Sequence, residues 1–283
     1  MPGKIIDGRK LAEEIKISLK EQIEELNRLG KRLPTLAVVL VGNDPASEVY
    51  VNHKSRACKQ IGIQSELYKF SDVMTEEELQ KELEKLNQNN NIDGILLQLP
   101  LPPQLDTYRC IAQIAPHKDV DGLTPLNQGN VLLNKSGLYP CTPLGILKIL
   151  ENIHNIRGAR VAVVGYGMLV GAPLVSMLVR AGATVIICHR NTKDPEKICA
   201  QADVLIVATG QKNLVNKNWV KEGAIVLDVG IHKEDKKLVG DVNFSDVLPL
   251  ASYISPVPGG VGPMTVAMLL SNCLKAYHEH NKS

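Results

Sequence analysis

The chain has 283 residues, of which 44% are hydrophobic, 22% charged and 4% aromatic, and its formal net charge is +2. This is the composition of an ordinary globular protein with enough length for two modest domains. A charge so close to zero argues against a dedicated nucleic-acid binder, and the scarcity of aromatic residues argues against base-stacking platforms.

The six cysteines are widely spaced and include no C-x-x-C pair. They are Cys58, Cys110, Cys141, Cys188, Cys199 and Cys273. This spacing fits neither a zinc knuckle nor a disulfide framework and is typical of a reducing compartment. The N-terminus lacks an apolar signal-peptide core, and no uninterrupted apolar stretch approaches the ~18 residues of a membrane span. We therefore expect a cytoplasmic protein with no membrane partner and no nucleic-acid partner.

Helices and strands alternate along the first half of the chain. Apolar periodicity predicts helices over residues 11–29, 46–61 and 75–86, and short apolar runs predict strands over 35–41, 65–70 and 93–99. Prolines at 100, 102 and 103 end the last of these strands. A β-α-β-α-β order predicts a parallel sheet with helices on both faces.

The alternation continues in the second half. A helix over 144–153 leads to strands expected over 160–164, 184–188, 203–207 and 224–228, and a proline- and glycine-rich loop over 256–263 precedes a last helix over 264–277. We expect an α/β protein of two α/β domains with a substrate cleft between them. The first would comprise residues 1–143 together with the C-terminal helix 264–283, and the second, Rossmann-type and dinucleotide-binding, residues 144–263.

The stretch Gly165-Tyr166-Gly167-x-x-x-Gly171 lies between a predicted strand and a predicted helix. Backbone N–H groups at such a helix start hold the phosphates of a dinucleotide, and a tight turn without a ligand is the alternative. A site that selects NAD usually has an acidic residue at the end of the next strand, but here that strand is followed by His189 and Arg190. Arg190 is either a solvated loop cation or a partner for a 2′-phosphate, and the missing acid favours NADP.

Three polar side chains of the first half do not fit a plain structural role. Tyr50 and Lys54 share one stripe of a predicted helix with apolar residues, so Lys54 is carried toward the interior. Lys54 is either a partly desolvated amine that transfers protons or a lysine whose side chain extends to water, and the second explanation is the simpler one. Gln98 lies at the carboxyl end of a strand, where it either meets a ligand or caps the proline turn that follows.

The loop Lys118-Asp119-Val120-Asp121-Gly122 contains two carboxylates, and an acidic turn is its ordinary explanation. The other ligands of a calcium loop are missing, so we expect no metal. Cys141 lies between two prolines with no base near it in sequence, and is expected to be a packing residue. His278 and His280 are expected to be exposed to solvent.

Five motifs occur in a characteristic order. They are Tyr50-Val-x-x-Lys54, Gly94-Ile-Leu-Leu-Gln98-Leu-Pro-Leu-Pro102, Lys118-Asp-Val-Asp121-Gly, Pro140-Cys-Thr-Pro143 and Pro256-Val-Pro-Gly-Gly-Val-Gly-Pro-Met-Thr265. Together they resemble the bifunctional methylenetetrahydrofolate dehydrogenase/methenyltetrahydrofolate cyclohydrolase family. The resemblance spans the whole chain, and the ten-residue motif at its end is highly specific.

The resemblance implies a homodimer of two-domain subunits that acts on tetrahydrofolate derivatives with NADP. Its first reaction moves a hydride from 5,10-methylenetetrahydrofolate to the nicotinamide, and its second hydrolyses the methenyl product to 10-formyltetrahydrofolate, in one-carbon metabolism and purine biosynthesis. Lys54 would be the key catalytic group with Gln98 as its partner. Tyr50 would lie against the folate and Asp121 would hold the pterin. Further substrate contacts would be Pro258 and Gly259, and the cofactor contacts Gly165, Tyr166, Gly167, Arg190 and Ile231.

One departure from the family concerns the glycine loop. Members often have Gly-Arg-Ser where this chain has Gly165-Tyr166-Gly167, so two usual contacts to the 2′-phosphate are missing. Either the positive charge has moved to Arg190 and NADP is preferred, or Tyr166 packs on the adenosine and selectivity loosens toward NAD. The nearest alternative function is a monofunctional cyclohydrolase with weak nucleotide binding. A non-catalytic scaffold would give Lys54 and Gln98 no reason to converge.

Overall fold

The computed structural model describes residues 3–235 and 237–281, and the chain divides into two compact units. One unit is formed by Glu14–Cys141 with the C-terminal residues from Val266, and the other by Thr142–Thr265 with the N-terminal residues up to Glu13. We call them the three-stranded unit and the six-stranded unit, after their main sheets. The expected class, an α/β protein with two parallel sheets, is confirmed.

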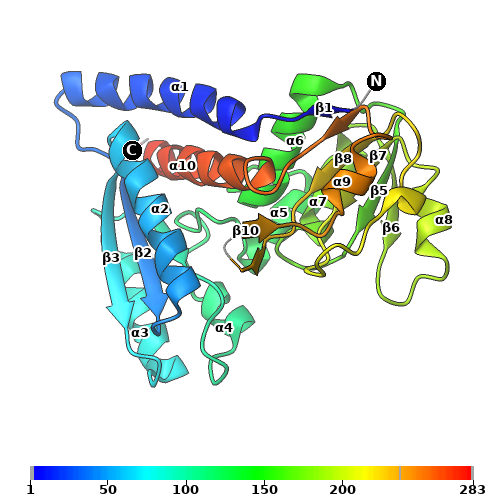
Figure 1. Ribbon diagram of the computed structural model, residues 1–283. Coiled ribbons are helices and arrows are strands. Elements are labelled where there is room, and N and C mark those ends of the chain that lie inside the picture. Colours follow the sequence, from blue (N-terminus) through cyan, green and yellow to red (C-terminus); the bar gives the residue numbers. More distant parts are fainter. Residues whose placement is uncertain (1–2, 236, 282–283) are drawn as a thin grey trace. The chain divides into compact units, whose positions relative to one another are not determined.

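The three-stranded unit has the strand order β3-β2-β4, with all pairs parallel. Figure 1 shows β3 beside β2. Its strands are β2 (Thr35–Val41), β3 (Gln64–Phe70) and β4 (Gly94–Leu97). Every residue of the central strand β2 is buried, because its sequence is a nearly continuous apolar run that can face protein on both sides. The outer strand β3 alternates between exposed and half-buried residues, as an edge strand does.

Two helices connect these strands, and both start and stop where the sequence supplies caps. The helix α2 (Pro45–Ile61) begins after Asp44, whose carboxylate accepts a hydrogen bond from Ser47 N at 2.8 Å, and ends at Gly62 in the left-handed region. The helix α3 (Glu76–Gln88) begins with a capping box between Thr75 and Glu78. Both predicted helices are confirmed to within two residues at either end.

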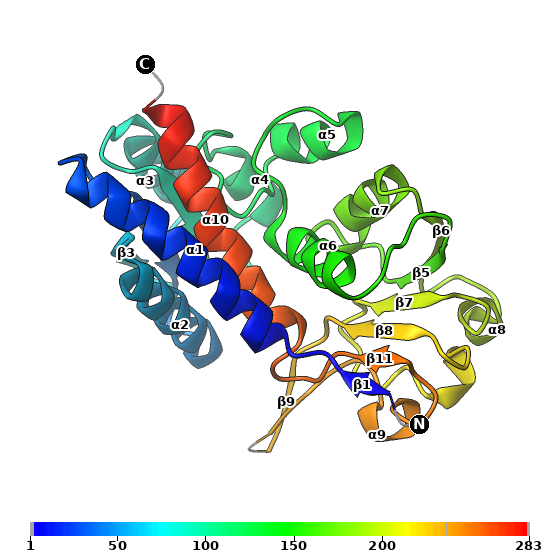
Figure 2. The ribbon, with the colours of Figure 1, turned by 90° about the horizontal axis from the view of Figure 1, so that it is seen from above.

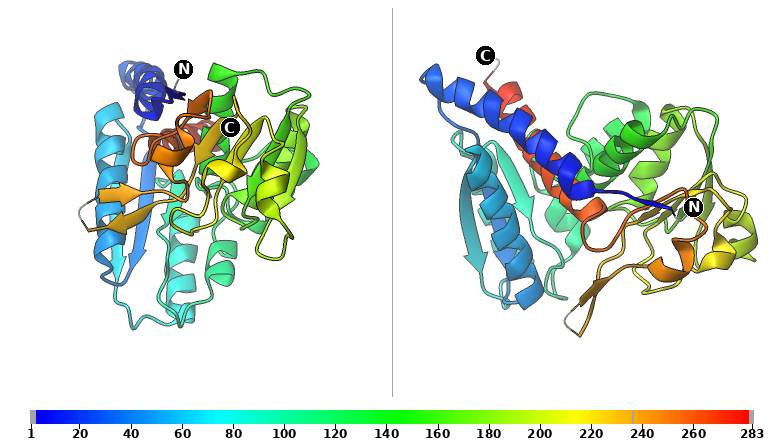
Figure 3. Two further views of the ribbon diagram at one scale, coloured as in Figure 1. Left: turned by 45° about the vertical axis from the view of Figure 1, so that its right-hand side comes forward. Right: turned by 45° about the horizontal axis from the view of Figure 1, so that its top comes forward.

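Four further helices contribute to this unit. They are α1 (Gly8–Arg28), α4 (Thr107–Ala112), α5 (Pro125–Leu133) and α10 (Val261–His280), of which α1 and α10 begin in the six-stranded unit. In the three-stranded unit α1 and α10 run side by side (Figure 2; Figure 3). The short helices α4 and α5 were not predicted, because neither is long enough to show a clear apolar period.

The six-stranded unit contains a fully parallel sheet with the strand order β1-β11-β8-β7-β5-β6 (Figure 2). The strands are β1 (Lys4–Ile5), β5 (Arg160–Val164), β6 (Thr184–Cys188), β7 (Val204–Val207), β8 (Ile225–Asp228) and β11 (Tyr253–Ile254). The strand order reverses between β5 and β7. In open α/β sheets such a reversal marks the crevice where ligands bind, at the carboxyl ends of the strands.

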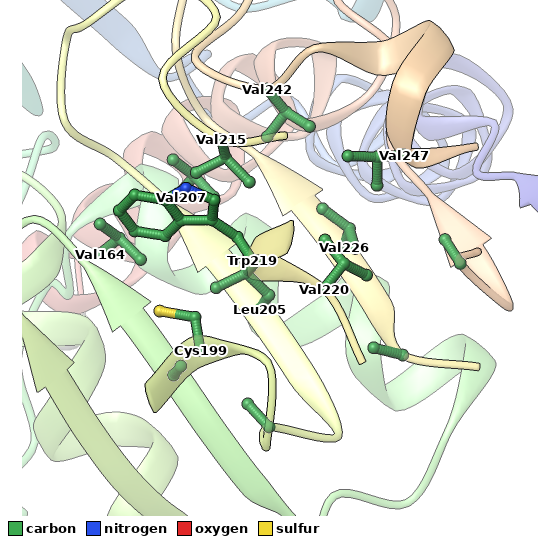
Figure 4. Close-up of a cluster of buried hydrophobic side chains, with 14 of the residues drawn as sticks. Val164, Cys199, Leu205, Val207, Val215, Trp219, Val220, Val226, Val242 and Val247 are labelled. Atoms are coloured by element: carbon green, nitrogen blue, oxygen red, sulfur yellow. The ribbon is translucent and has the colours of Figure 1, made fainter. Parts of the chain in front are cut away.

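Shorter elements complete the six-stranded unit. They are α6 (Cys141–Ile153), α7 (Gly171–Arg180), α8 (Pro195–Cys199), α9 (Phe244–Val247), the 3-10 helix η1 (Lys217–Trp219), and the antiparallel hairpin of β9 (His232–Glu234) and β10 (Lys237–Val239). A cluster of buried side chains packs one face of the sheet around Trp219 (Figure 4). Valines of β5, β7 and β8 point into this cluster, which fixes the strands whose ends carry the glycine loop.

The N-terminal boundary of the units differs from the expected one. Residues 1–143 were all assigned to the first domain, but β1 pairs in parallel with β11, so the N-terminal residues up to Glu13 belong to the six-stranded unit. A two-residue strand that pairs with the opposite end of the chain leaves no local pattern. None of the described helices has the length and apolar character needed to cross a membrane.

Candidate active site and nucleotide-binding site

Lys54 and Gln98 meet in the three-stranded unit. The ammonium Nζ of Lys54, half-buried on α2, donates a hydrogen bond to Gln98 Oε1 at 3.1 Å. Gln98 follows β4 and is only 7% exposed, and its Nε2 donates to the Leu99 carbonyl at 2.6 Å. The amide therefore presents its oxygen to the amine, and Lys54 does not extend away into solvent. Tyr50 lies one turn before Lys54 on the same face of α2 and is 41% exposed.

Asp121 is the third polar group at this place. Burial raises the pKa of its carboxyl, the nearby Lys54 ammonium opposes that rise, and the Asp119 carboxylate adds to it. The thiol of Cys141 lies near the same carboxyl and favours its charged form. As a residue Asp121 is only half-buried. An amine, an amide and a carboxylate thus gather at one point, as proton transfer and ligand binding require.

The other charged residues of the 118–122 loop have structural roles. Lys118 is 1% exposed, and its Nζ donates to the carbonyl oxygens of Leu86, Asn87 and Asn89 at 2.7–3.1 Å, which closes the end of α3. Asp119 is buried and accepts hydrogen bonds from the backbone N–H groups of Gly122 (3.0 Å) and Thr124 (2.7 Å) and from Asn127 Nδ2 (2.9 Å). The fold thus uses these two charges itself and leaves Asp121 for a ligand.

Cys141 and His280 lie in more polar surroundings than expected. Cys141 is buried, as a packing residue would be, but its Sγ also donates to the Val120 carbonyl at 3.1 Å. Burial and the adjacent Asp121 raise its pKa well above the usual value, which keeps the thiol protonated.

The expectation of a solvent-exposed His280 is wrong, because its Nδ1 lies 3.1 Å from Asp93 Oδ1. Asp93 also accepts two hydrogen bonds of 2.6 Å from Arg32. The Asp93 side chain is fully buried, and a buried carboxylate attracts further hydrogen-bond donors, here the His280 ring.

The glycine loop of the six-stranded unit has one open position between two crowded ones. Gly165 has φ +103°, and a Cβ there would meet the Ala208 carbonyl oxygen at 2.1 Å; a Cβ at Gly171 would meet the Gly165 carbonyl oxygen at the same distance. A Cβ at Gly167 would meet nothing within 4 Å. Gly165 and Gly171 thus serve packing, while Gly167 leaves room for a ligand against the backbone, which is the arrangement of a dinucleotide loop.

The helix α7 that follows this loop has no side-chain cap. Val170 occupies the N-cap position and offers no side-chain acceptor. Among the described residues, Ala172 N donates to the Gly167 carbonyl, Pro173 has no N–H and Leu174 N donates to the Val170 carbonyl, so Gly171 keeps the unpaired N–H group of this turn. Such a group, combined with the positive end of the helix dipole, favours a phosphate. Tyr166 is 53% exposed in the same loop. Together with the open space at Gly167, the uncapped helix fits the pyrophosphate of a dinucleotide.

Arg190 is exposed on a hydrogen-bonded turn directly after β6. His189 N donates to Thr192 Oγ1 at 2.9 Å and Thr192 N donates to the His189 carbonyl at 2.8 Å, which orders the turn. Among the residues that the structure describes, none forms an ion pair with Arg190. No acidic side chain ends β6 at the position that would hold a ribose 2′-hydroxyl.

Two buried aspartates, which sequence reasoning missed, organise the same edge of the sheet. Asp241 Oδ2 accepts hydrogen bonds from Thr209 N (2.6 Å), Thr209 Oγ1 (2.8 Å) and Gly210 N (2.9 Å), and its Oδ1 lies 2.7 Å from His232 Nε2. Asp228 accepts from the backbone N–H groups of three residues in the following loops. The exposed Ile231 lies between these anchors. The sequence feature that could have pointed to these aspartates is that each has a glycine next to it or two residues away: Asp228 precedes Gly230 and Asp241 follows Gly240.

Pro258 and Gly259 belong to the six-stranded unit, in the loop that leads into α10. Gly259 has φ +110°, and Gly260 N donates to the Pro256 carbonyl at 2.9 Å, so the loop is a closed turn. Pro258 is exposed at its tip. The candidate site residues are therefore divided: those expected to bind the pterin lie in the three-stranded unit, and Pro258, Gly259 and those expected to bind the nucleotide lie in the six-stranded unit.

Comparison with protein-family models gives two matches that together span most of the chain. Residues 6–121 match the catalytic domain of tetrahydrofolate dehydrogenase/cyclohydrolase, and residues 140–281 match its NAD(P)-binding domain. The division between the two models falls between the two sets of candidate residues described above.

Individual proteins resemble the chain over its whole length. The bifunctional protein FolD of Agathobacter rectalis is 47% identical over 274 residues, which covers 96% of this chain and 98% of that protein. The crystal structure of bifunctional FolD from Campylobacter jejuni matches with a TM-score of 0.95 at 44% identity, covering 98% of this chain and 99% of that one. The Trypanosoma brucei enzyme, solved with NADP cofactor and an inhibitor, has a TM-score of 0.95 at 34% identity over 100% of both chains. The chain belongs to the tetrahydrofolate dehydrogenase/cyclohydrolase family.

Proposed function

We propose that the protein oxidises 5,10-methylenetetrahydrofolate to 5,10-methenyltetrahydrofolate with NADP and then hydrolyses the product to 10-formyltetrahydrofolate. The observation that carries this proposal is the 3.1 Å hydrogen bond between Lys54 Nζ and Gln98 Oε1, beside the Asp121 carboxyl. A scaffold protein would have no use for a half-buried lysine held in this way. The bifunctional relatives described above support both activities.

Asp121 is the proposed anchor of the pterin. A carboxylate can accept two hydrogen bonds, here from the amino group and a ring N–H of the pterin, and so fixes the ring in one orientation. Tyr50, exposed on the same face of α2 as Lys54, would cover the ring. Accurate placement matters because hydride transfer depends on the alignment of the two carbon atoms more than on acid–base help.

Lys54 is the proposed proton carrier of the hydrolysis. Water adds its oxygen to the methenyl carbon while the neutral amine of Lys54 accepts one of its protons. The bond from that carbon to N5 then breaks as the remaining hydroxyl proton passes to N5, which yields the formyl group, and Lys54 releases its proton to solvent. Gln98 holds the amine in line through a hydrogen bond to its uncharged amide.

The six-stranded unit would hold the cofactor. NADP, when bound, supplies the nicotinamide ring that accepts the hydride. The Gly171 N–H and the positive end of the α7 dipole would hold the pyrophosphate, with its approach permitted by the open space at Gly167. Arg190 would pair with the 2′-phosphate. Ile231, Pro258 and Gly259 complete the proposed ligand contacts of this unit, so both units serve one reaction.

The proposal includes a homodimer that works in the cytoplasm and supplies formyl groups for purine biosynthesis. The outer strand β3 supports a dimer, because its backbone edge is unpaired among the described strands and Leu67 on it is 52% exposed. Six buried, unlinked cysteines support a reducing compartment. Light scattering behind a sizing column tests the dimer, and a monomeric mass at micromolar concentration would contradict it.

A pair of lysine variants tests the catalytic assignment. We expect Lys54→Met to lower the rate of methenyltetrahydrofolate hydrolysis by at least ~100-fold, the usual contribution of a general acid–base group. The matched control is Lys59→Met, an exposed lysine on the same helix, which should keep the wild-type rate. Both variants should still be stabilised thermally by NADP. Undiminished hydrolysis by Lys54→Met would remove Lys54 from the mechanism.

The dehydrogenase activity has its own test. Initial rates of methenyltetrahydrofolate formation are measured with NADP and with NAD at several concentrations, and we expect a clear preference for NADP. Comparable rates with NAD would show that the altered glycine loop has lost its selectivity. No oxidation with either nucleotide, together with normal methenyl hydrolysis, would identify a monofunctional cyclohydrolase.

A further inference from the structure

Asn272 makes an unusual set of contacts for a residue of the C-terminal helix. It lies on the part of α10 that belongs to the three-stranded unit, and it is only 4% exposed. Its Nδ2 donates to the carbonyl oxygens of Val120 and Tyr139, both at 2.8 Å, and lies 3.6 Å from Cys141 Sγ. Both amide hydrogens are therefore used on two segments that are far apart in sequence.

Both of these segments lead directly to the Asp121 carboxyl. Val120 immediately precedes Asp121, and its carbonyl also accepts the Cys141 thiol at 3.1 Å. Tyr139 lies two residues before Cys141, whose thiol lies near the Asp121 carboxyl. One buried amide thus holds the backbone that carries the carboxylate and the backbone that carries the neighbouring Cys141 thiol.

The turn around Asp121 is also held by hydrogen bonds within its own loop. Asp119 anchors the turn beyond Asp121 through the backbone N–H groups of Gly122 and Thr124. Gly122 has φ +72°, and a Cβ there would lie 2.4 Å from the Tyr139 carbonyl carbon, so the two segments already touch. Asn272 provides the hydrogen bonds that tie this contact to a helix.

We infer that Asn272 is a positioning residue for folate binding, acting through the backbone on either side of the Asp121 carboxylate. The inference rests on the proposed role of Asp121 in holding the pterin. The requirement is for a compact side chain with two N–H donors. A leucine of similar volume would leave two buried carbonyl oxygens unpaired, and an aspartate would face them with like charge. A serine retains one donor.

The test compares Michaelis constants for the two substrates. We expect Asn272→Leu to raise the KM for 5,10-methylenetetrahydrofolate by about 10-fold or more, as the loss of an oriented carboxylate does. The KM for NADP should stay within about twofold, because the change leaves the six-stranded unit intact. Asn272→Ser should give an intermediate rise. The control is Lys275→Ala, one turn further along α10, whose Nζ donates to the Gly137 carbonyl at an exposed site.

Two outcomes would overturn the inference. One is an unchanged folate KM in a folded Asn272→Leu variant. The other is a parallel rise of both KM values with a lowered melting temperature, which indicates a general structural role. Where Asn272→Leu does not fold, Asn272→Ser is judged by the same criteria.

Asp121→Asn, measured alongside, separates this inference from the proposed function. A raised folate KM in Asp121→Asn with no change in the Asn272 variants overturns the positioning role alone. An unchanged folate KM in Asp121→Asn overturns the pterin assignment itself, and the positioning role with it.

Discussion

A Cβ atom at Gly165 would lie 2.1 Å from the carbonyl oxygen of Ala208. Gly165 follows β5 and Ala208 follows β7, so the two residues meet where the strand order of the six-stranded sheet reverses. Gly165 also has φ +103°, a conformation that L side chains rarely adopt. The first glycine of the loop is therefore required by the fold of this unit before any nucleotide binds.

Alanine substitutions should distinguish the crowded Gly165 from the open Gly167. We expect Gly165→Ala to lower the free energy of unfolding by about 3 kcal/mol, because the methyl group must displace backbone atoms. Gly167→Ala should leave stability within about 1 kcal/mol of wild type and should not weaken NADP binding, because a Cβ there meets nothing within 4 Å and family members often have serine at this position. Urea unfolding and NADP titration measure the two effects. Equal loss of stability in both variants would contradict this division.

Removal of the Arg190 side chain should act on NADP alone. A charge-assisted hydrogen bond to a phosphate is worth about 1.5–3 kcal/mol, so we expect Arg190→Ala to raise the KM for NADP roughly 10- to 100-fold and to leave the KM for NAD unchanged. Lys193→Ala, a change of charge in the same loop, is the control and should have a smaller effect. Equal effects of Arg190→Ala on both nucleotides would show that Arg190 does not contact the 2′-phosphate.

The buried Lys118 should matter for stability and not for chemistry. Lys118→Met leaves three carbonyl oxygens at the end of α3 without their donor, and we expect a loss of about 3 kcal/mol in the free energy of unfolding. Lys81→Met, an exposed change on the same helix, should cost less than about 0.5 kcal/mol. At low temperature the folded Lys118→Met protein should keep near-normal kcat/KM. A loss of activity without a loss of stability would place Lys118 in the reaction.

Asp228 should make stability depend on pH. Burial is the main cause that raises its pKa from 3.8 to about 6, backbone N–H groups of Val242, Asp241 and Gly230 partly offset the rise, and the Asp241 carboxylate adds to it. The folded state therefore holds the proton more tightly than the unfolded state. Its stabilising contribution is fully present below pH ~3.8 and is lost as the pH rises through about 6, by up to about 3 kcal/mol.

Urea unfolding of wild type and Asp228→Asn between pH 4 and 7 measures this contribution. The wild-type free energy of unfolding should fall relative to that of the variant as the pH rises, whatever the variant's overall stability. Asp203→Asn is the control of opposite sign, because hydrogen bonding to Lys221 lowers the pKa of Asp203 and its stabilisation is lost as the pH falls. Parallel pH profiles for wild type and Asp228→Asn would contradict the raised pKa.

Elements with a strong local pattern were predictable. Strand β2 is a continuous apolar run, and α2 and α3 have caps and apolar residues at helical spacing, so each was placed to within two residues. The strands β1 and β11 and the hairpin of β9 and β10 were missed. They are two or three residues long, too short to show a periodic pattern of apolar residues. Pairing with distant strands or with the other side of a turn stabilises them, and the local sequence does not show such pairing.

For the candidate site, residue types and motif order identified Lys54, Gln98 and Asp121 as candidates, and left a structural alternative open for each. Only the structure shows that Lys54 and Gln98 are joined by a hydrogen bond. Asn272 had no comparable signal, because it is a single polar residue in an apolar stretch whose partners are distant backbone carbonyls. The Gly240–Asp241 step gave no indication that Asp241 meets Thr209 and His232.

The sequence by itself determined the α/β class, the main helices and strands, the glycine loop and the order of the family motifs. These depend on caps, turns and apolar periods, which arise from residues within about four positions of one another. The tertiary structure decided which polar groups meet. The Lys54–Gln98 bond joins residues 44 positions apart and the Asn272–Val120 bond joins residues 152 positions apart. Such contacts exist only because burial of the apolar strands and helices brings their ends together, and a buried polar group must then find a partner there.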